Sequence, residues 1–324
     1  MKALRYTLNH LLQGIALVLA VVVLNFLLVH AAPGDPVETI AGASGGMSDE
    51  LKAQLRTQYG LDRPLPVQLG VYLGKVLQGD IGHSYFFNLP VSQLILDRLP
   101  ATLLLVVTAV LASFLAGTAM GVLASRRPNG WLSQGITVLS LVGFAAPVFW
   151  TGMMLVILFA SVWPIFPVSG LRSVDATATG LALLPDVLHH LVLPALTLAL
   201  VYLAQYSRLS RASMLDVLGS DYIRTARAKG LADRVVLYKH ALRNAVLPVV
   251  TVLGLQFGNV LAGAILVETV FNWPGLGRLA FESVLRRDYP AILGVLLFSS
   301  MVVVVMNLLT DLCYRLIDPR IKTA

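Results

Sequence analysis

Cysteine and charge are both scarce in this chain. Among its 324 residues there is a single cysteine, Cys313, so no disulfide can form within the chain. Charged residues make up 13% and hydrophobic residues 57%, and a soluble domain of this length cannot bury that much apolar surface. The composition therefore excludes an ordinary soluble enzyme and predicts a membrane protein, in which Cys313 is a small apolar filler of the last hydrophobic run.

The sequence also lacks the phosphate-binding loop of ATPases. That loop needs a glycine, four residues of any kind, Gly-Lys, and then Ser or Thr. Here Gly74-Lys75 is followed by Val76, and Leu69 stands where the first glycine is needed. We therefore expect no ATP hydrolysis by the chain itself.

Motifs for catalysis within a membrane are lacking as well. An intramembrane enzyme needs paired acids, a Ser–His pair or a metal motif at mid-membrane depth, and the apolar runs offer none. His189 and His190 are adjacent, so they face different sides of a helix, and no cluster of carboxylates or cysteines accompanies them. We expect neither catalytic residues nor a metal site.

Long apolar runs are what the sequence does contain. In a bilayer only helices and closed barrels satisfy the backbone, and runs of about 20 residues are long enough for helices. The sequence predicts an all-α polytopic membrane protein with six transmembrane helices, at about 11–32, 100–124, 135–162, 189–207, 246–268 and 290–315. The first run is longer than the roughly 7–15 apolar residues of a signal peptide, so we expect it to be retained. Pro147 predicts a kink or an unwound turn in the third.

Lys and Arg predict the orientation of these helices. Loops that remain in the cytoplasm are enriched in basic residues, which also explains the net charge of +7 without nucleic acid as a partner. Most basic residues fall near residues 2–5, 126–127, 208–243 and 315–322. Both termini are therefore predicted to be cytoplasmic.

The same pattern divides the chain into two parts. Residues 1–99 comprise the first transmembrane helix and an external segment, and residues 100–324 form a five-span core containing a cytoplasmic loop at 208–247. In the external segment Ser48 can cap one helix, and a second is expected at about 64–78. This segment suits a lid over the outer mouth or a surface for another subunit.

The loop contains a short helix with clear boundaries. Gly219 ends the preceding helix, and Ser220 or Asp221 can cap a new one. Gly230 lies where a left-handed residue ends a helix, and Leu231 can then fold back on Ala226. A helix of about nine residues is marginal alone, so another surface must hold it. We expect that surface to approach the small-residue face formed by Ala226, Ala228 and Gly230.

A second helix follows and leads into the fifth span. Asp233 can cap it, and it runs to Leu247-Pro248, where the proline is tolerated in the first turn of the membrane helix. By composition alone, this basic loop is either an ordinary topology signal that touches anionic lipid or a docking site for a soluble partner.

Several residues near the fifth span have two interpretations each. Gln256 and Asn259 either line a pathway or form hydrogen bonds between helices. Trp273-Pro274-Gly275 is either an outer gate or binding-protein contact, or a tight turn with an aromatic anchor.

Two carboxylates and a set of small residues have a single interpretation each. Glu268 and Asp311 are expected near span ends, where a carboxylate reaches water. Close helix packing is expected from the small residues Gly254, Gly258 and Ala262.

The loop resembles the coupling loop of the permease subunits of bacterial ABC importers. That motif has an Ala, a Gly four residues on and a downstream Leu-Pro, which correspond to Ala226, Gly230 and Leu247-Pro248. Arg224 and Thr225 replace the family's Glu-Ala, and the glycine-to-proline spacing is longer. Both departures are typical of the peptide and nickel branch, and the chain is most similar to the B-type permease of dipeptide or oligopeptide importers.

Further matches to this branch run along nearly the whole chain in order. They are Pro33-Gly34-Asp35-Pro36, Gly79-Asp80-Ile81-Gly82-His83-Ser84, Leu99-Pro100-Ala101-Thr102, Pro147-Val148-Phe149-Trp150, Trp273-Pro274-Gly275-Leu276-Gly277, Arg287-Asp288-Tyr289-Pro290 and Asp318-Pro319-Arg320-Ile321.

The resemblance implies the type I ABC importer permease fold in a bacterial inner membrane, surrounded by membrane lipid. It implies a second homologous permease, two ATP-binding subunits that use ATP and Mg²⁺, and an external binding protein, while this chain binds no cofactor. The residues it assigns to coupling with the ATPase are Asp221, Tyr222, Arg224, Thr225, Ala226, Ala228, Lys229, Gly230 and Leu231.

Alternatives remain open at this point. Peptides are favoured as the cargo, but nickel or metal-chelate importers share the motifs. An intramembrane enzyme would have no need of an ATPase partner. A secondary transporter or channel would move solute without ATP, and such proteins often contain internal repeats, which this sequence does not show.

Overall fold

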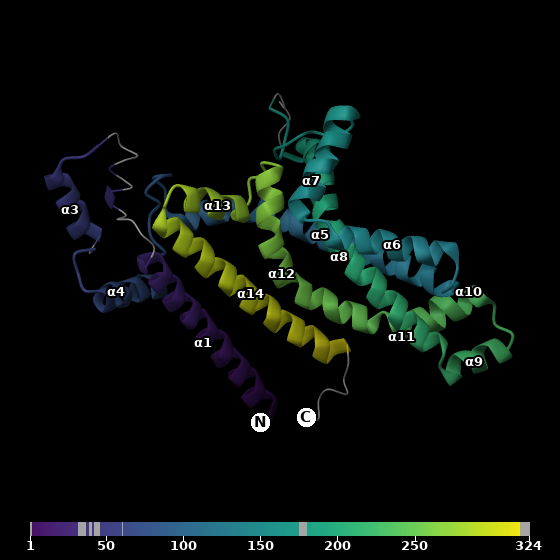
Figure 1. Cartoon of the computed structure of the whole chain (residues 1–324). Helices are drawn as coiled ribbons and strands as arrows, with labels where there is room; N and C mark the ends of the chain where they lie inside the picture. Colours follow the sequence, from purple (N-terminus) through teal and green to yellow (C-terminus); the bar gives the residue numbers. More distant parts are fainter. Residues whose placement is uncertain are drawn as a thin grey trace. The chain divides into compact units, whose positions relative to one another are not determined.

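The computed structural model describes residues 2–31, 37–38, 41, 46–59, 61–174 and 180–317. The predicted motifs at 33–36 and 318–321 lie outside the described residues, as do the side chains of Asn259, Ala262, Asp311 and Cys313. The chain folds into two compact units, residues 1–100 with 275–305, and residues 101–274 with 306–324. Figure 1 labels the helices of both units.

The first unit contains the helices that begin and end the sequence. They are α1 (Lys2–Ala31), α3 (Asp49–Tyr59), α4 (Leu65–Leu77), the start of α5 (Val91–Arg126), α13 (Leu276–Leu285) and most of α14 (Tyr289–Ile317). The predicted helices of the external segment are confirmed as α3 and α4, and the hydroxyl of Ser48 accepts a hydrogen bond from the Leu51 N–H at 3.3 Å.

Residues from both ends of the sequence share the core of the first unit. Val91, Leu94 and Ile95 of α5 are buried together with Leu276 and Leu279 of α13. The division predicted at residue 99 differs from this grouping, because residues 275–305 pack with the first hundred residues. Hydrophobic contacts between distant parts of a chain leave no mark on the local pattern.

The second unit contains the rest of α5 and the middle of the chain. Its elements are α6 (Trp131–Ala145), α7 (Val148–Val156), η1 (Ile157–Val162), η2 (Gly180–Leu183), α8 (Leu184–Leu218), α9 (Asp221–Ala228), α10 (Asp233–Val235), η3 (Val236–Ala241), α11 (Leu242–Ala245) and α12 (Leu247–Val270). The α6, α7 and α12 helices pack on α8, whose buried residues Leu193 and Leu198 form a core with Leu105 of α5 and Phe271.

Pro147 breaks the third apolar run, as predicted. The α6 helix ends at Ala145 and α7 begins at Val148, and the two are bent by 105°. The run over 135–162 is therefore a pair of helices bent at Pro147, and its crossing of the membrane as one span stays a prediction. Of the described helices, three are long and apolar enough to cross a membrane, or four if the bent pair is one span. The α1 and α12 helices include side chains outside the described part, so the count of six stays a prediction.

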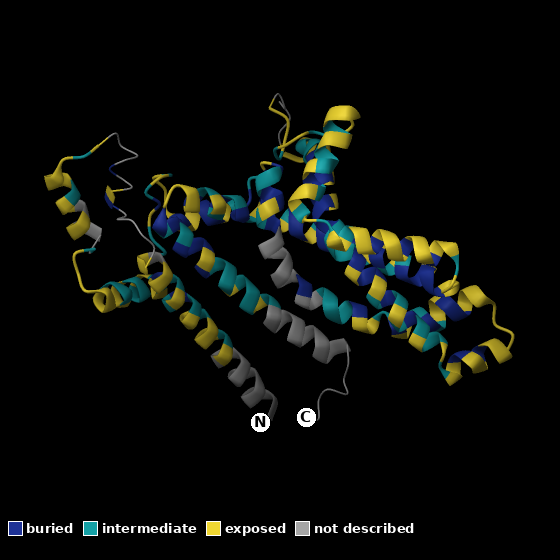
Figure 2. Ribbon diagram, viewed as in Figure 1, coloured by how far each residue is buried: buried dark blue, intermediate teal, exposed yellow. Residues whose placement is uncertain are grey.

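Large apolar side chains are exposed along several helices. Along α1, Leu24 and Leu28 are more than half exposed, and α6 exposes Val138, Leu139 and Phe144 similarly. Figure 2 shows exposed residues along both helices. Soluble monomers rarely expose apolar patches of this extent, so these faces are suited to lipid or to a neighbouring subunit.

A close contact between α5 and α8 depends on two glycines. A Cβ on Gly117 would lie 2.7 Å from Tyr206 Cβ, and one on Gly121 would lie 2.6 Å from the Ser207 carbonyl oxygen. The spacing is G-x-x-x-G within an apolar helix, which is a known signal for close helix packing. The prediction of close packing named only Gly254, Gly258 and Ala262 and did not include this pair.

The end of α12 places Glu268 differently from prediction. Glu268 is fully buried and accepts a hydrogen bond from Thr102 Oγ1 at 2.7 Å, so its predicted access to water is wrong. Asn272 has φ 51° and directs the chain inward, with the Trp273 N–H bonded to the Glu268 carbonyl oxygen at 2.8 Å.

Trp273 itself is fully buried, and its indole N–H donates to the Ala101 carbonyl oxygen at 2.8 Å. It is therefore the aromatic anchor of a tight turn, and its indole is not available to a binding protein in this conformation. Roles for Pro274 and Gly275 at an outer gate stay predictions.

Candidate functional site: the coupling loop

The α9 helix has the boundaries that the sequence predicts. Ser220 precedes it with extended backbone angles, although its hydroxyl donates to the Val217 carbonyl oxygen at 2.6 Å and does not cap the helix. At the other end Gly230 has φ 76°. The N–H of Leu231 bonds to the Ala226 carbonyl oxygen at 3.4 Å, and that of Gly230 to the Arg227 carbonyl oxygen at 2.9 Å. This pair of bonds is a Schellman motif, which needs the left-handed residue that glycine supplies.

The chain itself holds α9 in place. Ile223 is fully buried and Ala226 nearly so, and both pack against Met214 of α8 and against Val236 and Ala241 of η3. The expected small-residue face is therefore divided: the chain itself covers Ala226, while Ala228 and Gly230 remain exposed. Burial of these apolar groups explains how a helix of eight residues persists without a partner.

The opposite face of α9 is exposed and polar. Asp221, Tyr222, Arg224, Thr225, Ala228, Lys229, Gly230 and Leu231 are all exposed. Arg224 Nη1 lies 3.4 Å from Asp221 Oδ1, and both side chains are largely in solvent, so this ion pair contributes little to stability. Eight of the nine residues predicted to contact an ATPase are thus accessible; the exception is Ala226. Their contact with an ATPase stays a prediction.

Tyr222 connects α9 to the segment that returns to the membrane. Its hydroxyl accepts a hydrogen bond from Asn244 Nδ2 at 2.8 Å and donates to the His240 carbonyl oxygen at 3.4 Å. Sequence patterns gave no signal for this contact, because the partner residues are 18 and 22 positions away.

Removal of this hydroxyl should loosen α9 with little effect on the fold. The Tyr222→Phe variant loses two hydrogen bonds, each worth about 1 kcal/mol. We therefore expect the backbone amides of residues 221–231 to exchange with deuterium several-fold faster than in the unchanged protein. Tyr238→Phe is the matched control, because Tyr238 is half-exposed in the same loop with no hydrogen bond among the described residues. Equal exchange in the two variants would show that the Tyr222 contact does not hold α9.

The return segment is one nearly continuous helix that leads into the membrane. From Asp233 to Ala245 it passes through a π-helical turn at Val236–Ala241, and Pro248 then lies in the first turn of α12, as predicted. The expectation that Asp233 caps this helix is wrong. Asp233 is its first residue, and Oδ1 instead lies 3.9 Å from Arg227 Nε of α9.

Gln256 makes a contact between helices. It is buried in α12, and its Nε2 donates to Gln205 Oε1 of α8 at 3.3 Å. This is the interhelical hydrogen bond that we weighed against a pathway role.

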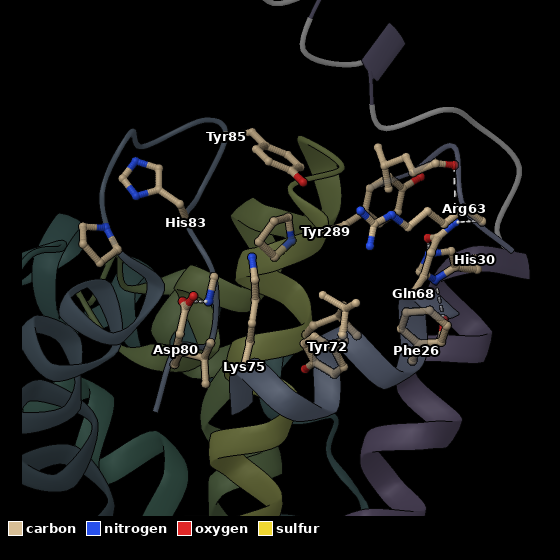
Figure 3. A pocket seen from close by; sticks show the side chains of 17 residues that line it. Phe26, His30, Arg63, Gln68, Tyr72, Lys75, Asp80, His83, Tyr85 and Tyr289 are labelled. Carbon is tan, nitrogen blue, oxygen red and sulfur yellow. Dashed lines mark hydrogen bonds between the residues drawn. The ribbon is translucent and has the colours of Figure 1, made fainter. Parts of the chain in front are cut away.

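The first unit contains a cavity of about 560 Å³. Rings of Phe26, Tyr72, Tyr85 and Tyr289 line it together with Arg63, Lys75, Asp80, His30 and His83, as Figure 3 shows. Burial raises the pKa of Tyr72 to about 12, so its hydroxyl stays protonated at neutral pH. In the described part of the chain, no carboxylate forms an ion pair with Arg63 or Lys75.

Two of the family-like motifs, residues 79–84 and residues 287–290, meet at this cavity. Asp288 is buried and accepts hydrogen bonds from the Ser84 hydroxyl and from the Tyr85 N–H at 3.3 Å. Gly82 has φ 98°, and a Cβ there would already lie 3.4 Å from Pro290. The wall formed by residues 80–90 is thus fixed to the start of α14.

The fold and the loop together define a helical membrane protein in which α9 is anchored on one face and exposed on the other. Comparison with known proteins gives the family. Residues 117–323 match the binding-protein-dependent transport system inner membrane component, and residues 3–106 match the N-terminal component of such systems. The chain belongs to this family: it is a transport permease subunit of the ABC importer type, embedded in the inner membrane, and not an enzyme.

Curated relatives match over nearly their whole length. The chain is 42% identical to the dipeptide transport system permease protein DppB of Escherichia coli over 98% of this chain and 99% of the relative. It is 40% identical to the oligopeptide transport system permease protein AppB of Bacillus subtilis over the same shares. An inward-facing structure of the MetNI methionine ABC transporter matches 70% of this chain and 97% of its own, with 16% identity and a TM-score of 0.55, which supports the fold.

Proposed function

We propose that this chain is one of two permease subunits of an ATP-driven importer of short peptides. A second, homologous permease completes the pathway, an external binding protein delivers the peptide, and two ATP-binding subunits in the cytoplasm hydrolyse ATP. Both termini face the cytoplasm. The single observation that supports the coupling role is the α9 helix, which is anchored by Ile223 and Ala226 and exposes its polar face.

Coupling requires a lever that transmits force without melting. The buried contacts of α9 and the Tyr222 hydrogen bonds fix it to α8 and to the η3–α11 segment that leads into α12, and the Schellman motif at Gly230 closes its end. Closure of the ATPases around the exposed face would therefore displace α9 as a rigid body. The membrane helices would follow, because each conformation of the pathway is favoured by a different state of the ATPases.

Peptides are proposed as cargo on two grounds. The relatives over nearly the full length are named as dipeptide and oligopeptide permeases. The cavity of the first unit offers the cations Arg63 and Lys75, the carboxylate of Asp80 and aromatic walls, a combination that suits a zwitterion with apolar side chains.

Transport by the complete complex tests this proposal. The permease, its partner permease, both ATPases and the binding protein would be reconstituted in vesicles, and accumulation of a radiolabelled dipeptide would be measured. We expect uptake that requires ATP and the binding protein. Uptake of a nickel chelate but not of dipeptides or tripeptides would contradict the assigned cargo, and uptake without ATP would contradict the assigned mechanism.

A further inference from the structure

A second cavity, of about 610 Å³, lies beside α9 in the second unit. Its charged lining consists of four arginines and one carboxylate: Arg126, Arg127, Arg227, Arg234 and Asp233. The arginines come from two places in the sequence, the turn between α5 and α6 and the α9–α10 segment. We propose that this cavity binds the phosphate of an anionic membrane lipid.

The charges of the cavity favour a phosphate. Guanidinium groups bind phosphate oxygens through paired, charge-assisted hydrogen bonds, and several of them can share one phosphate. Among the described residues, Asp233 alone offers a counter-charge in the lining, and its Oδ1 lies 3.9 Å from Arg227 Nε, with both side chains exposed. The cavity therefore has a strong excess of donors.

The first turn of α6 adds uncharged donors to the same wall. Gly130 precedes α6 without a side-chain cap, so the N–H groups of this turn remain available to an anion. Ser133 lines the cavity in that turn; its side chain is 2% exposed, and its hydroxyl has no hydrogen-bond partner among the described residues. A phosphate oxygen that reached this wall would give the buried hydroxyl a partner.

The geometry of the turn keeps the cavity in shape. Arg211 Nη2 of α8 donates to the Pro128 carbonyl oxygen at 3.1 Å, and the Gly130 N–H donates to the Arg127 carbonyl oxygen at 2.9 Å. These bonds hold the α5–α6 turn against α8, so a ligand meets a preformed site.

Surrounding apolar residues favour a lipid over a free phosphate. Trp131 is 85% exposed at the edge of the cavity, and its neighbours in the lining, Leu123 and Leu132, are also exposed. Tryptophan is enriched where a membrane meets water, and basic pockets next to membrane helices hold lipid headgroups. A phospholipid satisfies both halves of the site, since its phosphate meets the arginines while its acyl chains cover the apolar residues.

A lipid in this position would connect the α5–α6 turn to α9. Arg227 belongs to α9 and Arg234 to α10, while Arg126 and Arg127 end α5. The bound headgroup would add a contact that holds the coupling helix at the membrane surface. Placement of this cavity in the cytoplasmic leaflet rests on the proposed function, whereas lipid binding itself does not.

Native mass spectrometry of the purified whole transporter tests the site. Palmitoyl-oleoyl phosphatidylglycerol would be titrated into the detergent, with the phosphatidylcholine of the same chains as the neutral probe. In the double variant Arg126→Gln with Arg127→Gln, we expect the tightest phosphatidylglycerol to be bound about tenfold more weakly, since charge-assisted hydrogen bonds are lost. Arg234→Gln, on the other side of the cavity, should weaken the same binding event.

The control removes the same amount of charge from the neighbouring η3–α11 segment. Lys239→Gln with Arg243→Gln affects two exposed residues outside the cavity and should leave the affinity unchanged. Equal losses in the two double variants would overturn the proposal, because they would indicate general attraction of lipid to a basic surface. Displacement of phosphatidylglycerol by millimolar inorganic phosphate would overturn the lipid assignment in favour of a free phosphate. Because transport is not measured, failure of peptide uptake would leave this result intact.

Discussion

Gly230→Val is expected to reduce peptide uptake at least about tenfold while the ATPase subunits remain bound and active. Gly230 has φ 76°, and left-handed angles cost an L-residue about 1–2 kcal/mol, with β-branched residues penalised most. No atom of the described residues lies within 4 Å of a Cβ built at this position, so the backbone angle and not the volume of the side chain causes the effect. Relief of this strain breaks the Schellman motif and releases the end of α9.

The measurement pairs uptake with ATP hydrolysis in reconstituted vesicles. Uncoupling appears as hydrolysis that continues without a matching accumulation of peptide. Gly230→Asn is the matched control, because asparagine tolerates left-handed angles and should retain most of the uptake. Normal uptake by the valine variant would show that the α9 end is not part of the lever. Loss of the ATPases during purification would instead indicate that the loop is needed for assembly.

Gly121→Ala should destabilise the permease even though alanine favours helices. A Cβ there would lie 2.6 Å from the Ser207 carbonyl oxygen and 2.8 Å from the Arg211 backbone nitrogen. Backbone atoms of α8 cannot move aside as a flexible side chain does, so the two helices must separate. We expect a loss of about 1–3 kcal/mol, the usual range for overpacking of a close contact.

Gly135→Ala provides the comparison for this variant. Gly135 lies within α6, and in the part of the chain that the structure describes no atom lies within 4 Å of a Cβ built on it. Both substitutions gain the same helix propensity of up to about 1 kcal/mol, so the difference between them isolates the contact with α8. Thermal unfolding of the purified permease, followed by tryptophan fluorescence, should show a lower midpoint for Gly121→Ala only. Equal midpoints would mean that α5 and α8 are not this close in the membrane.

Backbone rules explain why parts of the coupling loop were predictable. The left-handed Gly230 and the position of Pro248 both follow from the identity of one residue and its immediate neighbours. The bend at Pro147 follows from the same kind of rule. The burial of Ala226 and Glu268 has a different origin, because burial depends on residues distant in the sequence.

The family-like motifs also show that a local sequence pattern does not determine which distant residues come into contact. The stretches at 79–84 and 287–290 could be recognised in the sequence, but nothing in their spacing places Ser84 against Asp288. Likewise, the four arginines of the second cavity are present in the sequence as two ordinary basic loops. Only the packing of α9 and the α5–α6 turn onto α8 brings them to one site.

The sequence by itself therefore determined the membrane class, the helical fold, the family and the boundaries of the coupling helix, since these depend on hydrophobic run length and local backbone preferences. Only the tertiary structure decided which face of α9 is buried, that Trp273 is an anchor, and where cations converge. Those outcomes depend on contacts between side chains far apart in the chain, which no local pattern encodes.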